Sequence, residues 1–363
     1  MSKNIFDKDT VMTSPSTKPS LDSLSKLHGR TQKRLLVWAL ATSCATTSFA
    51  LTACGSSSTP AAKTPEQEPA TDEEREALIL KVQMLIEDGD AASAIPLLKE
   101  AIAASPYDPQ LALLMGVAHE SDGSADEAIV EYRRALKIQP KLLDASQNLS
   151  GLLIDINRPQ EALVVADAGL AFVPEDKALL INRAYALDIM DDPATIPAFE
   201  KALELAPKDG VLRLYFVQRL ILSEQKERAF QELAAIPLDG KSVPVIEVVA
   251  LYSRLDDFQG CVKAIDIAVE TEQSVELYVH RANCKERLKD AAGAEADYRL
   301  AVATDANSAD AHYWLARFLT NAGQGQEART HLEKAAELGP NTPAGKAAQR
   351  VLDKSAASAA AAE

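Results

Sequence analysis

Aromatic side chains are scarce in this chain of 363 residues, making up 5% of it with only two tryptophans. Glycine and proline are also sparse, at 15 and 18 residues. β-Sandwiches and propellers need many aromatic and turn residues, so the composition argues against both and favours helices rich in alanine and leucine. Four cysteines are too few for a disulfide scaffold. With a hydrophobic content of 47%, the chain is not expected to be disordered along its whole length.

Basic residues are outnumbered, with 38 Lys and Arg against 53 Asp and Glu and a net charge of −15. This acidic balance argues against a nucleic-acid partner, because phosphate binding needs a basic face. The charge is uneven along the chain. Residues 1–53 carry seven basic and three acidic residues, a net +4, so the remainder carries −19, the difference between −15 and +4.

The N-terminal segment has the sequence of regions that is typical of an export signal, a basic cluster followed by an apolar stretch. A stretch of apolar and small residues runs from Leu35 to Ala50, directly after a basic cluster formed by Arg30, Lys33 and Arg34. At about 16 residues, this stretch suits a signal peptide and is short for a membrane span. It leads into Leu51-Thr52-Ala53-Cys54-Gly55, which resembles the bacterial lipobox.

The lipobox resemblance implies that residues 1–53 are removed and that Cys54 receives a lipid anchor. Residues 54–70 would then be the lipidated cysteine and a flexible tether, since they contain almost nothing large to bury. Gly55 in place of Asp resembles outer-membrane lipoproteins that face the periplasm, with inner-membrane anchoring as the alternative. A plain signal peptide cut after Ala50, or an uncleaved anchor, remains open.

The body of the chain is built from an internal repeat. Pro106, Pro140 and Pro174 are each 34 residues apart, Pro207 follows after 33, and each closes a helical pattern. This period resembles the tetratricopeptide repeat, a helix–turn–helix unit. The small residues that precede these prolines recur further along the chain at Ala268, Ala301 and Ala335.

Residues 109–142 match the repeat best. Gly116 and Ala128 are small enough for two helices to approach closely, and Tyr132 fills the space beyond them. Pro140 cannot continue a helix and ends the unit. Elsewhere the pattern weakens, since Pro237 interrupts the second helix of the unit at 210–241.

The resemblance implies an all-α fold, a right-handed α-solenoid of about eight repeats. The array is expected over 71–342, a capping helix over 343–354 and a disordered tail over 355–363. The units are expected near 75–108, 109–142, 143–176, 177–209, 210–241, 242–274, 275–308 and 309–342.

Residue patterns typical of catalysis are missing from the sequence. Five histidines are present, and only His280 has a partner at metal-ligand spacing, Cys284 four residues later. Phosphate-binding glycine loops and nucleophile elbows are also missing. We therefore expect no catalytic residue, no metal, no cofactor and no small-molecule substrate.

Cys261 and Cys284 fall on the second helix of one repeat and the first helix of the next. A disulfide could form between them in an oxidising compartment if their Cα atoms lie within about 7 Å. The alternative is two small buried thiols.

In the repeat family, the first helix of each unit lines a concave, ligand-binding face. Transferred to this chain, that rule predicts a groove for an apolar peptide or helix, with a basic end for an acidic group. The alternative is that these residues only support the inner helices. The candidate groove residues are Leu113, Val117, Ile181, Tyr185, Leu214, Ile221, Ile246, Asn283, Arg287, Tyr313 and Arg317.

The function expected from these patterns is a non-enzymatic, membrane-tethered scaffold for protein partners in a bacterial envelope. The chain is similar to tetratricopeptide lipoproteins that assist pilus or secretion-machine assembly, or that hold cell-wall enzymes. Two alternatives stay open. One is an enzyme with a repeat extension, and the other is a cytoplasm-facing signalling module on an uncleaved anchor.

Overall fold

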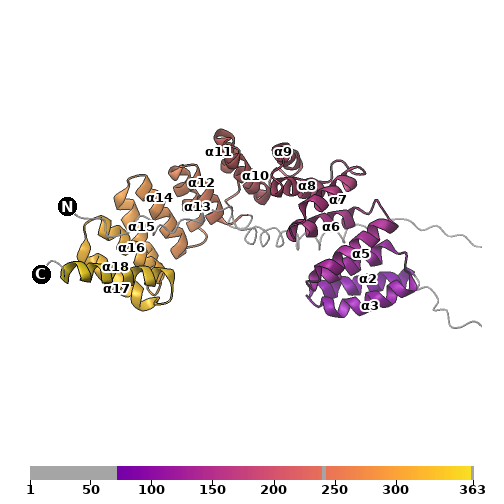
Figure 1. Cartoon of the computed structure of the whole chain (residues 1–363), viewed down its shortest axis with the longest axis horizontal. Helices are drawn as coiled ribbons and strands as arrows, with labels where there is room; N and C mark the ends of the chain where they lie inside the picture. The colour runs from indigo at the N-terminus through magenta and orange to yellow at the C-terminus, as the bar shows by residue number, and fades with distance from the viewer. Residues whose placement is uncertain (1–71, 239–242, 361–363) are drawn as a thin grey trace, which may run out of the picture. The chain divides into compact units, whose positions relative to one another are not determined.

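The structure, a computed structural model, describes residues 72–238 and 243–360, in which every regular element is an α-helix (Figure 1). These residues form two compact units that divide between Ala206 and Pro207. We call residues 72–206 the N-terminal unit and residues 207–360 the C-terminal unit. Among the described residues, none of the helices is long and apolar enough to cross a membrane.

The N-terminal unit contains four helix pairs, and each helix packs on its chain neighbour. Aspartates begin several of these helices. The Asp108 carboxylate accepts hydrogen bonds from the free backbone N–H groups of Gln110 and Leu111, and Pro109 fills the first helical position. The helices are α2 (Asp72–Glu87), α3 (Ala91–Ala104), α4 (Pro109–Ser121), α5 (Ala125–Ile138), α6 (Leu143–Asp155), α7 (Pro159–Leu170), α8 (Lys177–Ile189) and α9 (Thr195–Leu205).

The C-terminal unit contains four further pairs and a final single helix. Its α11 has only nine residues and ends before Pro237, which confirms the truncation expected there. The helices are α10 (Gly210–Leu222), α11 (Lys226–Ala234), α12 (Val245–Arg254), α13 (Phe258–Val269), α14 (Val275–Arg287), α15 (Ala291–Thr304), α16 (Ala309–Asn321), α17 (Gly325–Leu338) and α18 (Pro343–Ala360).

The residues that define the repeat are the ones that let the helices approach. A Cβ atom placed on Gly116 of α4 would lie 2.5 Å from the Tyr132 ring of α5, so only glycine fits there. Ala128, Tyr132 and Ala135 are fully buried in the same pair. The packing reason inferred for these residues from the sequence is therefore confirmed.

The all-helical array of paired helices predicted from the sequence is confirmed in each unit. One boundary was wrong, because the tail expected to be disordered from 355 onward is helical through Ala360. Its alanine-rich sequence has high helix propensity and simply continues α18. The predicted signal peptide over 1–53 and the tether over 54–70 lie outside the described residues.

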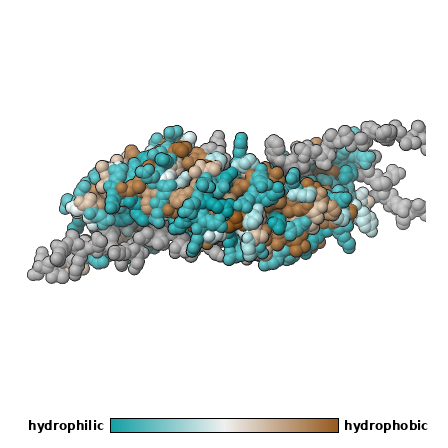
Figure 2. Space-filling model, turned by 90° about the horizontal axis from the view of Figure 1, so that it is seen from above, coloured by the Kyte–Doolittle hydropathy of each residue, from teal (hydrophilic) through white to brown (hydrophobic). Residues whose placement is uncertain are grey.

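On the face seen in Figure 2, hydrophilic side chains cover much of the helical surface, and apolar ones lie between them. The apolar cores of the two units lie between the helices of each pair and between neighbouring pairs. In the C-terminal unit, the last such core joins α16 and α17 to α18 through Ala344, Ala347 and Ala348.

Candidate functional site

The candidate groove residues of the N-terminal unit lie on α4 and α8. On α4, the core contacts with α2 and α3 come from Leu111, Leu114, Met115 and Ala118. Leu113 and Val117 follow one another by one helical turn on a different side of the same helix. Both are buried, as is Tyr185 of α8, whereas Ile181 of α8 is partly exposed.

In the C-terminal unit, the apolar candidates differ in exposure. Leu214 is buried, and Ile221 and Ile246 are partly exposed. Tyr313 is buried in the core that joins α16, α17 and α18, so in this helix the supporting role accounts for the side chain. Of these apolar candidates, Ile221 and Ile246 therefore have accessible surface that a partner could contact.

At the predicted basic end of the groove, Arg317 is paired with an acidic residue of the same unit. The Arg317 guanidinium donates to the Glu286 carboxylate at 2.5 Å and to the Asn283 side-chain oxygen at 3.1 Å. It also lies over the Trp314 ring, 4.6 Å from its centre. The pairing with Glu286 offsets part of the positive charge that Arg317 would offer to an acidic ligand. Arg287 is exposed, and its guanidinium stacks 4.4 Å from the centre of the Phe258 ring.

A tyrosine completes this polar cluster. The Tyr298 hydroxyl donates to Glu286 at 2.5 Å, and burial raises the pKa of Tyr298 above its usual value, so the hydroxyl keeps its proton. The same pair recurs in the N-terminal unit, where the Tyr132 hydroxyl donates to Glu120 at 2.7 Å. There, burial and the charge of Glu120 raise the pKa of Asp155 to about 7. The sequence signal for both pairs was a glutamate twelve residues before the tyrosine.

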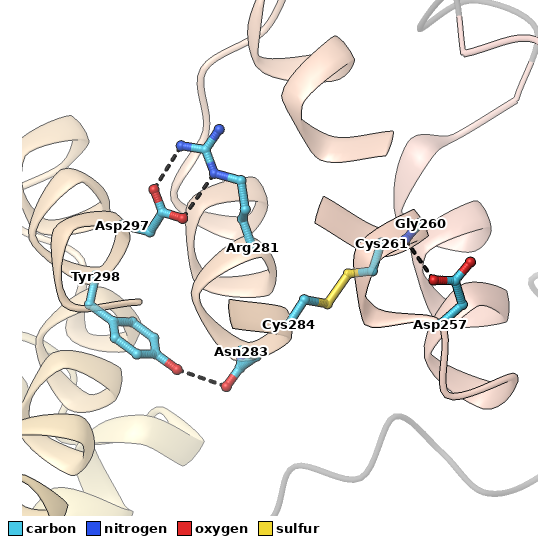
Figure 3. The surroundings of a disulfide bond; sticks show 8 residues. All are labelled: Asp257, Gly260, Cys261, Arg281, Asn283, Cys284, Asp297 and Tyr298. Atoms are coloured by element: carbon cyan, nitrogen blue, oxygen red, sulfur yellow. Dashed lines mark hydrogen bonds and ion pairs between the residues drawn. A yellow bond between two sulfur atoms is a disulfide. The ribbon is translucent and has the colours of Figure 1, made fainter. Parts of the chain in front are cut away.

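Cys261 of α13 and Cys284 of α14 form a disulfide, with Cα atoms 6.4 Å apart (Figure 3). It joins the second helix of one pair to the first helix of the next. Cys284 therefore has no free thiolate, so the half metal site considered with His280 does not exist. The described residues contain no group of three or more His, Cys, Asp and Glu side chains that could hold a metal ion.

An ion-pair network continues from the disulfide across α13, α14 and α15. Arg281 donates to both carboxylate oxygens of Asp297, at 2.9 and 2.7 Å, and to Asp266 at 2.7 Å. Lys285 also contacts Asp297, whose side chain is only 2% exposed. Figure 3 shows Arg281 and Cys284 on the same helix, so the disulfide and the network fix α14 from both neighbours.

A histidine pair in the last repeat was not anticipated from the sequence. The Nδ1 atoms of His312 and His331 lie 2.8 Å apart, and the rings stack. His312 Nε2 donates to the Ala306 carbonyl, and in a neutral imidazole this leaves Nδ1 as the acceptor from His331. The two histidines are 19 positions apart, a spacing that gave no sequence signal.

The family described as tetratricopeptide repeat matches the chain twice, at residues 109–142 and at residues 287–352. One match falls in each unit. The first coincides with the helix pair α4 and α5, where Gly116 packs on Tyr132. No curated protein matches the chain.

Several solved structures align with the chain at low identity. A tetratricopeptide repeat protein from Parabacteroides merdae aligns at 21% identity and a TM-score of 0.47, over 67% of this chain and 98% of its own. PilF of Pseudomonas aeruginosa aligns at 20% and 0.48, over 58% and 98%. PilW, described as a type IV pilus biogenesis factor, aligns at 15% and 0.48, over 56% and 94%. Similarity at this level assigns no function. The family matches show tetratricopeptide repeats at residues 109–142 of the N-terminal unit and at residues 287–352 of the C-terminal unit.

Proposed function

We propose that this protein is a non-enzymatic scaffold that binds protein partners through the first helices of its repeats. The observation that carries the proposal is the presence of tetratricopeptide repeats in both units, since this fold presents a row of parallel helix faces to a peptide or helix. Ile181 of α8, Ile221 of α10 and Ile246 of α12 are partly exposed. Ile181 would contact an apolar partner surface on the N-terminal unit, and Ile221 and Ile246 would do so on the C-terminal unit.

The proposal places the scaffold on a membrane of the bacterial envelope. The support is the sequence Leu51-Thr52-Ala53-Cys54-Gly55 behind a short apolar stretch, as in lipoproteins. We propose the outer membrane, with the repeats facing the periplasm, because glycine follows the cysteine. A tether of residues 55–70 would let the repeats reach partners away from the bilayer.

Within the envelope, two roles fit such a scaffold equally. It could assist the assembly of a pilus or secretion machine, or it could recruit cell-wall enzymes. Crosslinking and affinity capture of the membrane-bound protein tests the proposal. We expect a defined partner, and capture of none under several growth conditions would count against the scaffold.

Lipidation of Cys54 is testable by itself. Cells that express the protein should incorporate labelled palmitate into it, and Cys54→Ala should abolish the label because the acceptor thiol is lost. Cys44→Ala is the matched control, since Cys44 lies in the segment predicted to be removed. Label that persists in Cys54→Ala, or disappears in Cys44→Ala, would overturn the anchor.

A further inference from the structure

The first helix of the N-terminal unit exposes an apolar edge. Leu80 and Met84 of α2 are 60% and 56% exposed, and Ala77 lies exposed one turn before Leu80. These three residues share one face of α2, because they are three and four residues apart. We call them the α2 edge.

The same positions are buried in the next repeat. Thirty-four residues after the α2 edge come Leu111, Leu114 and Ala118 of α4, and all three pack in the core formed with α2 and α3. This pattern recurs in α8, where Leu179, Asn182 and Ala186 are buried. The α2 edge thus has the residues of a surface that packs on a preceding helix, and the structure leaves Leu80 and Met84 largely uncovered.

Acidic residues surround the α2 edge. Glu73, Glu76 and Glu87 are all exposed on α2, and Lys81 is the one exposed base among the helix's described residues. Two copies that met edge to edge would therefore place like charges together, which disfavours a symmetric contact through α2. A basic helix is the complementary occupant.

The C-terminal helix of the same chain has this character. Its inner side packs on α16 and α17 through Ala344, Ala347 and Ala348. Its outer side exposes Lys346 and Arg350, which are one turn apart. Long basic side chains can cover apolar surface with their methylene stems while their charges face carboxylates.

We propose that α18 of one copy docks on the α2 edge of a second copy. Lys346 and Arg350 would face the acidic residues that surround the edge, and their stems would cover Leu80 and Met84. Such a head-to-tail contact leaves one α2 edge and one α18 unused at the two ends, so further copies add in series until the assembly closes into a ring or grows as an open chain. A single helix edge buries little area, so the association is expected to be weak and to weaken further in salt. The proposal requires neither the groove nor the lipid anchor.

Sedimentation velocity of the purified full chain over a wide concentration range tests this contact. We expect reversible self-association at low salt. Leu80→Glu should raise the apparent dissociation constant at least tenfold, and so should the pair Lys346→Glu with Arg350→Glu. Val164→Glu is the matched control, because Val164 of α7 is 69% exposed and lies away from α2 and α18 in the sequence. Unchanged helicity by circular dichroism confirms that each variant is folded.

Exchanging the charges around the α2 edge and on α18 is the decisive test of the contact. Glu73→Lys with Glu76→Lys should weaken self-association, and combining this pair with Lys346→Glu and Arg350→Glu should restore it. A chain that stays monomeric at all concentrations overturns the proposal. Loss of association in Leu80→Glu with full retention in the α18 variant also overturns it, since another surface would then occupy the α2 edge. Failure of the combined variant to associate would also overturn the proposal.

Discussion

Replacing Arg281 by alanine is expected to destabilise the C-terminal unit by about 3 kcal/mol. Arg281 makes two hydrogen bonds to Asp297 and one to Asp266. Without it, the buried Asp297 carboxylate keeps only its contact with Lys285 at 2.8 Å. A buried charge that loses its bidentate partner costs far more than an exposed ion pair contributes.

Urea unfolding followed by tryptophan fluorescence measures this effect. Trp314 of α16 reports on the C-terminal unit, and Trp38→Phe in the background removes the other tryptophan. Arg299→Ala is the matched control, because Arg299 pairs with Glu295 and Glu327 at an exposed site on α15. The control should cost less than about 1 kcal/mol. Equal losses in the two variants would mean that the buried network does not hold α14 in place.

Loss of the disulfide is expected to destabilise the C-terminal unit by about 3 kcal/mol, because the bond closes a loop between residues 23 apart in sequence. The double variant Cys261→Ala with Cys284→Ala should therefore unfold at lower urea than the oxidised protein. Both sulfur atoms are buried in the core of α12, α13 and α14, so part of the loss will come from packing.

Treatment with a reductant separates the contribution of the disulfide bond from that of side-chain packing. Dithiothreitol should lower the urea midpoint of the unmodified protein and leave that of the alanine variant unchanged. A monitor of the N-terminal unit, such as hydrogen exchange in α4 to α7, should not respond to either treatment. Identical unfolding of the oxidised and reduced protein would show that the bond contributes nothing.

The helix pairs could be read from the sequence because their signals are local. The 34-residue spacing of Pro106, Pro140 and Pro174 marks the helix ends. Gly116 and Tyr132 then mark where two helices touch. The corresponding places of another unit, 275–308, again hold a small and a large residue, Ala282 and Tyr298.

The polar contacts between repeats could not be read in the same way. Arg317 was expected to present a positive charge, yet it pairs with Glu286, which lies 31 residues earlier in the preceding repeat. His312 and His331 meet only because α16 packs on α17. Side-chain pairing across helices depends on rotamers and burial, which a periodic pattern does not encode.

Site-resolved photo-crosslinking in cells tests the scaffold most directly. A photoreactive residue at Ile181 or Ile246, both partly exposed on first helices, should give an adduct with a defined partner protein. The same residue at Val164, which is well exposed on the second helix α7, should not give that adduct. An equal adduct from Val164, or none from either isoleucine, would contradict binding through the first helices.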